Sequence, residues 1–279
     1  MVGYIFVSNR ARWWEKRLNI ILTTRFKENY IYELSSLNKK CVEKLKKKLI
    51  KNNIKQIACE KEVQQYMKKN EIISEKNVIK YLIFEILEYI FEIQEKKMEQ
   101  EDIYFLINND DEIYLQSIKM LLDKFKTTNI VTENFGRFQK IIENLFEEET
   151  TIYLSNNKRK SLKRAKYIVN FDYNMEELRE YNINRTAIII NIKQNVKIES
   201  LAFEGININN VNIQLSDQLI EYFGNLIENI SENILYMSLI NQKQELTRIR
   251  NRIKEDNIHI LNLMGDKGEI SKEEFKRIP

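Results

Sequence analysis

One short segment of the chain concentrates basic side chains that could bind an anion. It runs from Asn156 to Lys166 and carries six cations: Lys158, Arg159, Lys160, Lys163, Arg164 and Lys166. The segment follows an apolar run, Thr151 to Leu154, so its backbone amides are expected at the end of a predicted strand. Amides and cations in that place suit a phosphate group. The alternative is the solvated face of a short helix predicted over Ser161 to Ala165.

Carboxylates follow other predicted strands and suggest a different chemistry. They are Asp110, Asp111, Glu133 and Asp172. Carboxyl ends of parallel strands meet at one edge of a sheet, where ligands bind, so these oxygens could hold Mg²⁺ there. Capping of helix N-termini explains Asp110 and Asp172 just as well. We therefore predict caps and no metal site.

Other catalytic arrangements lack the residues they need. His259 is the only histidine, which excludes a His-rich metal site, and any Ser-His-Asp or Cys-His arrangement would have to use it. No Gly-x-Ser-x-Gly motif is present. The cysteines, Cys41 and Cys59, form no CxxC pair and lie in apolar or amphipathic runs, which predicts reduced core thiols.

The composition is that of a folded protein without a strong preference for polyanions. Of the 279 residues, 43% are hydrophobic and 31% are charged, and 45 basic residues nearly cancel 41 acidic ones, for a net charge of +4. The first residues do not resemble a signal peptide, and no apolar run reaches the roughly 18 uncharged residues of a membrane span. We expect a cytoplasmic protein with no membrane partner.

The hydrophobic pattern predicts two α/β domains followed by helices. Residues 1–97 are expected to form a smaller N-terminal domain that ends in a long helix over 77–97. Its predicted strands are 3–8, 18–23, 29–34 and 54–59, with a helix over 37–50. The polar tract 94–101 is the expected boundary.

Residues 101–215 alternate between predicted strands and helices, which is the pattern of a parallel sheet with right-handed crossovers. The strands are expected at 103–107, 129–132, 151–154, 167–171 and 187–192. A strand order of 3-2-1-4-5 follows, with 103–107 central. Edge strands or a hairpin are expected within 196–215.

The remaining chain, 216–279, is predicted to be helical and to pack back on the N-terminal domain. Ser271 and Glu274 have the spacing of a capping box for a last short helix. Near the other terminus, Trp13 and Trp14 are flanked by Arg10, Arg12, Lys16 and Arg17. They could form a cation–π or interface patch, but we interpret them as a loop that covers the core.

Two strand-to-helix turns carry a family resemblance. The first is Val131-Thr132-Glu133-Asn134-Phe135-Gly136-Arg137, and the second strand ends in Ser155-Asn156-Asn157-Lys158-Arg159-Lys160. Over about 45 residues the chain resembles the NAD(P)-binding domain of the shikimate dehydrogenase and glutamyl-tRNA reductase type. The resemblance implies a Rossmann-like fold with NADP as cofactor. The residues it implies for cofactor binding are Glu133, Gly136, Asn156, Asn157, Lys158, Arg159 and Ser161.

The chain departs from that family at the glycines. Thr132 and Asn134 stand where glycines would permit the tight turn and the approach of the pyrophosphate, and Glu133 adds a repelling carboxylate. Gly136 could serve as the third glycine, which allows close helix packing. The preceding turn, Asn108 to Asp111, has no glycine and is acidic. We therefore predict that the fold is kept and that canonical cofactor binding is lost.

Three functions remain as hypotheses. The first is a non-catalytic role in ligand sensing, regulation or protein interaction, with a small molecule, another protein or a second copy of the chain as partner. The second is an NADP-dependent oxidoreductase of the shikimate dehydrogenase type. The third is a nucleic-acid-binding protein that uses the basic residues 158–166, which the absence of interleaved aromatic residues disfavours.

Overall fold

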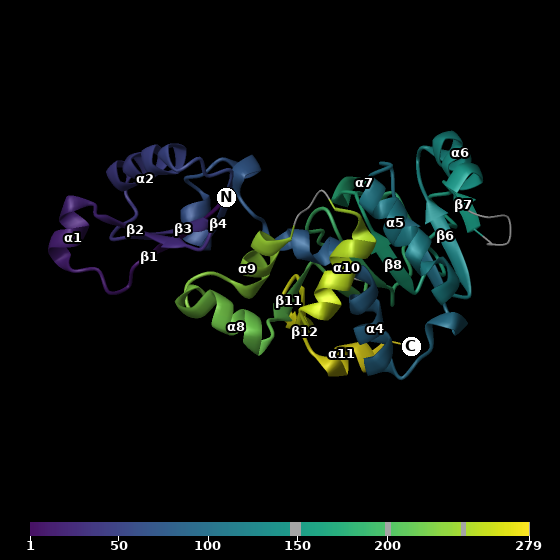
Figure 1. Ribbon diagram of the computed structural model, residues 1–279. Coiled ribbons are helices and arrows are strands. Elements are labelled where there is room, and N and C mark those ends of the chain that lie inside the picture. The colour runs from purple at the N-terminus through teal and green to yellow at the C-terminus, as the bar shows by residue number, and fades with distance from the viewer. Residues whose placement is uncertain (146–151, 199–201, 241–243, 279) are drawn as a thin grey trace. The chain divides into compact units, whose positions relative to one another are not determined.

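The computed structural model describes residues 1–145, 152–198, 202–240 and 244–278, and it is an α/β protein (Figure 1). Its contacts divide the chain into two compact units. The first unit comprises Met1–Glu75, Gln214–Lys243 and Lys254–Ile258, and the second comprises Lys76–Ile213, Gln244–Ile253 and His259–Pro279. The division falls at residue 75 because the apolar helix after it packs within the second unit. The polar tract 94–101 therefore lies inside that unit.

A four-stranded sheet forms the centre of the first unit. Its order is β2 (Ile21–Phe26), β3 (Asn29–Leu34), β1 (Val2–Val7), β4 (Gln56–Cys59). Strand β1 is parallel to β3 and β4, whereas β2 is antiparallel to β3. Helix α2 (Lys39–Lys51) buries Cys41, Val42, Leu45 and Leu49, a spacing of three and four that places them on one face. These elements agree with the predicted ones within a few residues.

Further helices of the first unit are short. They are α1 (Trp13–Leu18), α3 (Lys61–Gln64), α8 (Asp217–Phe223) and α9 (Glu232–Leu239), with 3-10 turns at Lys69–Glu71 and Gly224–Leu226. Helix α1 buries none of its residues, and Trp13 is 73% exposed. The interpretation of Trp13 and Trp14 as a loop over the core is therefore wrong. Both cysteines are free and buried, as predicted.

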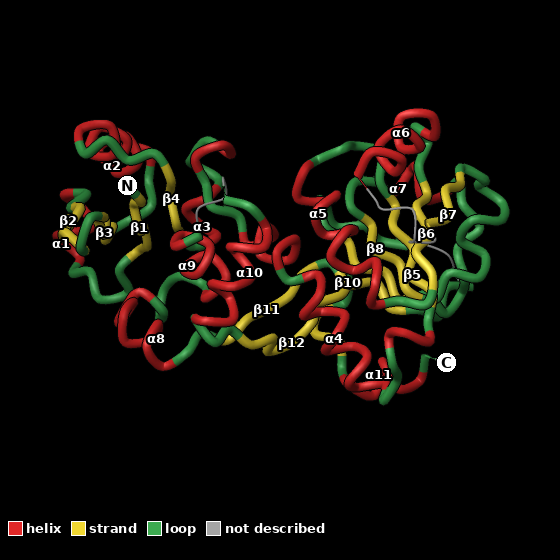
Figure 2. Tube along the Cα trace, turned by 45° about the vertical axis from the view of Figure 1, so that its right-hand side comes forward, coloured by secondary structure: helices red, strands yellow, loops and turns green. Residues whose placement is uncertain are grey.

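The second unit is built on a six-stranded parallel sheet. Its order is β10 (Ile206–Ile208), β9 (Ile188–Asn191), β8 (Tyr167–Asn170), β5 (Asp102–Leu106), β6 (Thr127–Val131), β7 (Ile152–Ser155). Figure 2 shows β8, β5, β6 and β7 as neighbouring yellow strands. Numbered along the chain, the order is 3-2-1-4-5-6. The predicted order is confirmed, and β10 adds a sixth strand.

Strands β8 and β9 lie deep because their side chains are mostly apolar on both faces. All four residues of β8 and of β9 are buried, as expected for a parallel sheet covered on both sides. Helices α5 (Glu112–Leu121), α6 (Phe135–Leu145) and α7 (Met175–Arg179) connect successive strands, with a 3-10 turn at Leu122–Lys124 after α5. Between β7 and β8 the predicted helix over 161–165 is absent, and a series of turns replaces it.

The other elements of the second unit flank this sheet. The predicted helix over 77–97 is a 3-10 segment, Glu75–Tyr81, followed by α4 (Ile83–Gln94) and a further 3-10 turn at Met98–Gln100. Helix α4 ends at Glu95, which has a left-handed backbone with φ of 54°. Helix α10 (Leu246–Glu255) also belongs largely to this unit.

The C-terminal region is not entirely helical, contrary to the prediction. Strands β12 (His259–Gly265) and β13 (Gly268–Ile270) form an antiparallel pair, and β11 (Asn210–Gln214) completes a three-stranded sheet. Gly268 supplies the φ of +115° that the turn needs. Helix α11 (Lys272–Arg277) begins with the predicted Ser271–Glu274 capping box and packs on α4 (Figure 1). Among the described helices, none is long and apolar enough to cross a membrane.

Candidate functional site at the carboxyl edge of the parallel sheet

Four neighbouring strands of the six-stranded sheet end at the same level. Leu106 of β5 pairs with Val131 of β6 and with Asn170 of β8, and Val131 pairs with Ser155 of β7. The segments that follow therefore start side by side, as the sequence predicted. They contain every predicted binding residue: Asp110, Asp111, Glu133, Gly136, Asn156, Asn157, Lys158, Arg159, Ser161 and Asp172.

The carboxylate of Asp172 occupies the turn after β5. Its Oδ1 accepts a hydrogen bond from the backbone amide of Asn108 at 2.8 Å, and its Oδ2 accepts one from the amide of Asn109 at the same distance. The side-chain amide of Asn109 also donates to Oδ2, at 2.5 Å. In a dinucleotide-binding domain, amides of this turn receive the pyrophosphate. Here a buried side chain of the protein, 9% exposed, receives them.

The turn after β6 is joined to the same network by Asn108. The Oδ1 atom of Asn108 accepts from the backbone amide of Glu133 at 2.9 Å, and its carbonyl oxygen accepts from the side chain of Asn134 at 2.9 Å. The hydroxyl of the fully buried Thr132 accepts from the amide of Asn134 at 3.1 Å. The side chains of Thr132 and Asn134, which the family resemblance aligns with the first two glycines, thus bind neighbouring backbone groups. The strand that the glycine-rich turn follows in a dinucleotide-binding domain is the first of the order 3-2-1-4-5-6, which here is β5 and not β6.

Ion pairs satisfy the charges at the rim of this edge. Arg137 lies 2.5 Å from Asp110, and its hydrogen bond lowers the pKa of that carboxyl. Lys158 lies 3.2 Å from Glu133 and also pairs with Glu180. The hydrogen bonds from Lys158 to Glu180 and then to Glu133 raise the pKa of the ammonium group. Lys158 is therefore already neutralised, which weakens its predicted role as a phosphate ligand and the nucleic-acid hypothesis with it.

The basic loop after β7 binds its own backbone. The Oδ1 atom of Asn157 accepts from the amides of Arg159 at 3.1 Å and Lys160 at 3.0 Å. Ser161 donates to the carbonyl of Asn157 at 2.7 Å and bonds Ser155 at 2.6 Å. An asparagine that holds a turn in this way competes with a helix, which is the physical reason for the missing helix over 161–165. No interaction of the exposed Asn156 side chain links it to this network within the described residues.

Gly136 lies in the first turn of α6, where a Cβ atom would meet nothing within 4 Å. The prediction that it permits close helix packing is therefore wrong. The residue is exposed, and a side chain would fit there without strain. Its place among the implied cofactor-binding residues stays a prediction that the packing does not explain.

The predicted helix caps are assigned to the wrong carboxylates. Asp111 caps α5 by accepting from the amide of Ile113 at 3.0 Å, and Asn174 caps α7. Asp110 and Asp172, predicted as caps, instead form the ion pair and the turn contacts described above. Within the ranges that the structure describes, no three His, Cys, Asp or Glu side chains come together as a metal site. The single histidine, His259, is exposed on β12.

The strand order of the sheet and the position of this edge define the fold class of the second unit. A parallel sheet of order 3-2-1-4-5-6, with α/β crossovers and a reversal of the chain order between β5 and β8, is a Rossmann-like α/β unit. No family model matches the chain, and no curated protein matches it. Among solved structures it is similar to L-tryptophan dehydrogenase from Nostoc punctiforme, with 9% identity over 91% of this chain and 87% of that one, at a TM-score of 0.38. A likeness of that degree decides nothing about chemistry.

No motif in the sequence indicated the polar network itself. Asn108, Asn109 and Thr132 stand where bare backbone is expected, and the sequence identifies them only as replacements for glycine. Their partner Asp172 is 63 or more positions away from the first two. A contact across that separation depends on strand order and register, which the sequence does not show directly. The only sequence signal for this contact is that Asn or Asp residues follow both β5 and β8.

Proposed function

We propose that the protein is a non-catalytic binding protein with a ligand-sensing or regulatory role. In this proposal the Rossmann-like unit is a scaffold, and no dinucleotide binds at its carboxyl edge. One observation carries the proposal: the carboxylate of Asp172 receives the amides of Asn108 and Asn109 that a pyrophosphate would need.

Charge and desolvation support this proposal. A diphosphate in the crevice would have to displace a buried carboxylate that accepts three hydrogen bonds. The displaced Asp172 would then lie beside two more negative charges, and like charges at about 4 Å repel by roughly 4 kcal/mol near a protein surface. Hydrogen bonds to a charged group contribute about 1.5–3 kcal/mol each, so the displacement also costs stability.

The experiment is a thermal-unfolding screen with NAD, NADH, NADP, NADPH and ATP at millimolar concentration. We expect no increase in the unfolding temperature with any of them, because a ligand stabilises the native state only if it binds it. Asp172→Ala should destabilise the protein by about 2–3 kcal/mol, since it leaves the turn amides unpaired. Asp123→Ala, which removes an exposed carboxylate in the same unit, is the matched control.

A second function has one observation in its favour. The strand order 3-2-1-4-5-6 is that of dinucleotide-binding domains, whose ligands lie at the switch point between the first and fourth strands. An NADP-dependent oxidoreductase would need Asp172 to move. Micromolar NADPH affinity that Asn157→Ala weakens would replace our proposal with this one.

A further inference from the structure

A cavity of about 790 Å³ opens in the second unit. Its described walls come from four parts of the chain: Lys163 in the turns before β8, helix α7, the connection 181–185 that leads into β9, and residues 196–198 and 202–203 before β10. The volume lies within the range of small-molecule sites, about 300–1,000 Å³. None of the residues that bind Asp172 lines it.

The floor of the cavity is part of the hydrophobic core. Leu178 and Val196 are each 2% exposed and belong to the core cluster on this face of the sheet. Met175, Ile183 and Phe203 pack against that cluster and are partly exposed to the cavity. Apolar side chains that remain accessible beside a closed core can bury the apolar body of a ligand.

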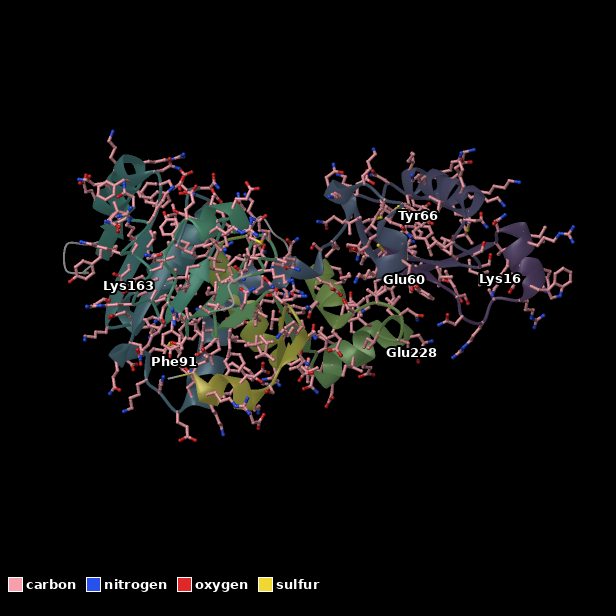
Figure 3. The ribbon with its side chains drawn as sticks, turned by 180° about the vertical axis from the view of Figure 1, so that it is seen from behind. Lys16, Glu60, Tyr66, Phe91, Lys163 and Glu228 are labelled. Carbon is pink, nitrogen blue, oxygen red and sulfur yellow. The ribbon has the colours of Figure 1, made fainter. Side chains whose placement is uncertain are left out.

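Cations surround this apolar floor. Lys163, Arg179, Arg185 and Lys197 line the cavity, and they come from four different parts of the sequence. None of the described lining residues is acidic. Lys163, Arg185 and Lys197 form no ion pair with any described residue. Lys163 is labelled in Figure 3.

Glu176 and Glu204 adjoin lining residues in the sequence, but both are exposed and neither is among the described lining residues. Two other acidic side chains close in sequence have partners elsewhere. On α7, Glu177 accepts from the backbone amide of Asn174 at 2.6 Å in the capping box. Glu180, which follows α7, pairs with Lys158. Neither of these two carboxylates neutralises the cations that line the cavity. An anionic ligand would therefore be attracted electrostatically by those cations.

The wall made by residues 182–185 is anchored to the rest of the unit. The amide of Asn182 donates to the carbonyl of Lys158 at 2.9 Å, and the amide of Asn184 donates to the carbonyl of Leu162 at 3.0 Å. The side chain of Asn184 accepts from the amide of Thr186 at 3.1 Å. These bonds fix the position of Ile183 and Arg185, so the cavity is formed before a ligand arrives.

We infer that this cavity binds a small organic anion with an apolar body, an acyl chain or aromatic ring that carries a carboxylate or a phosphate. The apolar body would lie against Leu178, Ile183 and Phe203, and the anionic group would lie among Lys163, Arg185 and Lys197. The inference rests on the proposed function, a binding role without a dinucleotide at the sheet edge, and adds the class of ligand.

The test uses the fluorescent anion anilinonaphthalene sulfonate with the full-length protein. We expect saturable binding, and displacement by decanoate or decyl phosphate but not by decanol or decyltrimethylammonium. The two effective competitors distinguish a carboxylate preference from a phosphate preference. Competition by decanol equal to that by both anions would overturn the inference, because the cations would then contribute nothing.

Two variants locate the binding. The double variant Arg185→Glu with Lys197→Glu should weaken probe binding at least about tenfold, a factor that corresponds to the loss of a single strong charged contact. The matched control, Arg164→Glu with Lys193→Glu, has the same net charge, and neither residue lines the cavity. Equal weakening in the two double variants would contradict the assignment. Circular dichroism and thermal unfolding confirm that both are folded.

The apolar part is tested separately by Ala202→Trp, which places a ring in the cavity from an exposed position. We expect loss of probe binding with an unchanged unfolding temperature, and unchanged binding would contradict the inference.

NADPH binding is also measured for every variant, to distinguish failure of the cavity from failure of the proposed function. NADPH binding that Ala202→Trp leaves intact would refute the proposed function, whereas failure of the anion to bind with no NADPH binding would refute the cavity alone.

Discussion

Lys76 is a partly buried ammonium group whose charge the fold disfavours. Its Nζ atom donates to the carbonyl oxygen of Asn191 at 2.8 Å and to that of Asn209. Burial nevertheless lowers the pKa of Lys76 to about 8, from 10.5 for an exposed lysine. The native protein therefore releases this proton at a pH at which the unfolded chain still holds it.

The pKa of Lys76 predicts a dependence of stability on pH. At Lys76 the unfolded chain binds more protons than the native state between pH 8 and 10, so this group makes the free energy of unfolding rise with pH. Burial raises the pKa of Cys41 and Cys59, so these thiols ionise first in the unfolded chain and oppose that rise over the same range. We expect Lys76 to contribute a rise of about 1–2 kcal/mol after allowing for its partial exposure. Above about pH 10 the tyrosines of the unfolded chain ionise and oppose it. Urea unfolding at several pH values measures the effect.

Lys76→Met is the variant that tests this assignment. It removes the titrating group and keeps the apolar stem, so the change in the free energy of unfolding between pH 8 and 10 should be about 1–2 kcal/mol less positive than in the unmodified protein. Lys97→Met, at an exposed position of the same unit, should show the same change as the unmodified protein. An equal change in Lys76→Met and the unmodified protein would mean that Lys76 contributes nothing.

At the scale of elements, a largely buried ion pair joins α10 to α4. The guanidinium of Arg250 donates to Oε1 of Glu85 through Nε at 3.1 Å and Nη2 at 2.8 Å. The two side chains are only 11% and 18% exposed. The guanidinium also lies 4.5 Å from the ring centroid of Phe84. The other carboxylate oxygen of Glu85 has no hydrogen-bond partner among the described residues, so the pair depends on Arg250.

Removal of Arg250 should therefore destabilise the second unit strongly. Arg250→Ala leaves the carboxylate of Glu85 buried and unpaired, which costs about 3–5 kcal/mol. The double variant Glu85→Leu with Arg250→Met should recover most of that loss, because neither charge remains buried. Arg248→Ala, at an exposed position of α10, should change the free energy of unfolding by less than about 0.5 kcal/mol. Chemical denaturation measures all three, and a double variant as unstable as Arg250→Ala would contradict the explanation.

The sequence predicted those elements whose pattern is local. The strands of the parallel sheet are apolar on both faces and separated by amphipathic helices, and the order 3-2-1-4-5 follows from this alternation. The turns over 161–164 could not be predicted from spacing, because Asn157 bonds the backbone in place of a helix. The β12–β13 pair was missed because His259 to Gly265 has the length and apolar content of a short helix.

The candidate site depends on contacts that sequence patterns do not encode. The missing glycines predicted that the phosphate-binding turn is altered, and this stays a prediction about cofactor binding. The choice of Asp172 as the acceptor, rather than Asp110 or Asp111, depends on which strands are neighbours. The cations of the cavity, such as Lys163 and Lys197, come from separate segments, so no motif links them.

At the scale of the whole molecule, each unit has a core of its own. One core cluster of the first unit contains Leu45, and its buried members all lie before position 75. The core that contains Ile168 is formed entirely by residues of the second unit. Separate cores are the usual basis of separate cooperative units, even when the chain passes between them more than once.

Separate cores predict two unfolding transitions that respond to different substitutions. Leu45→Ala and Ile168→Ala each remove a fully buried side chain and should each cost about 2–5 kcal/mol. In calorimetry we expect each variant to lower the temperature of one transition and leave the other within error. Leu18→Ala, at a position that is 58% exposed, should move neither. A single transition that both core variants lower to the same extent would mean that the two cores unfold as one cooperative unit, because damage to either core would then destabilise both.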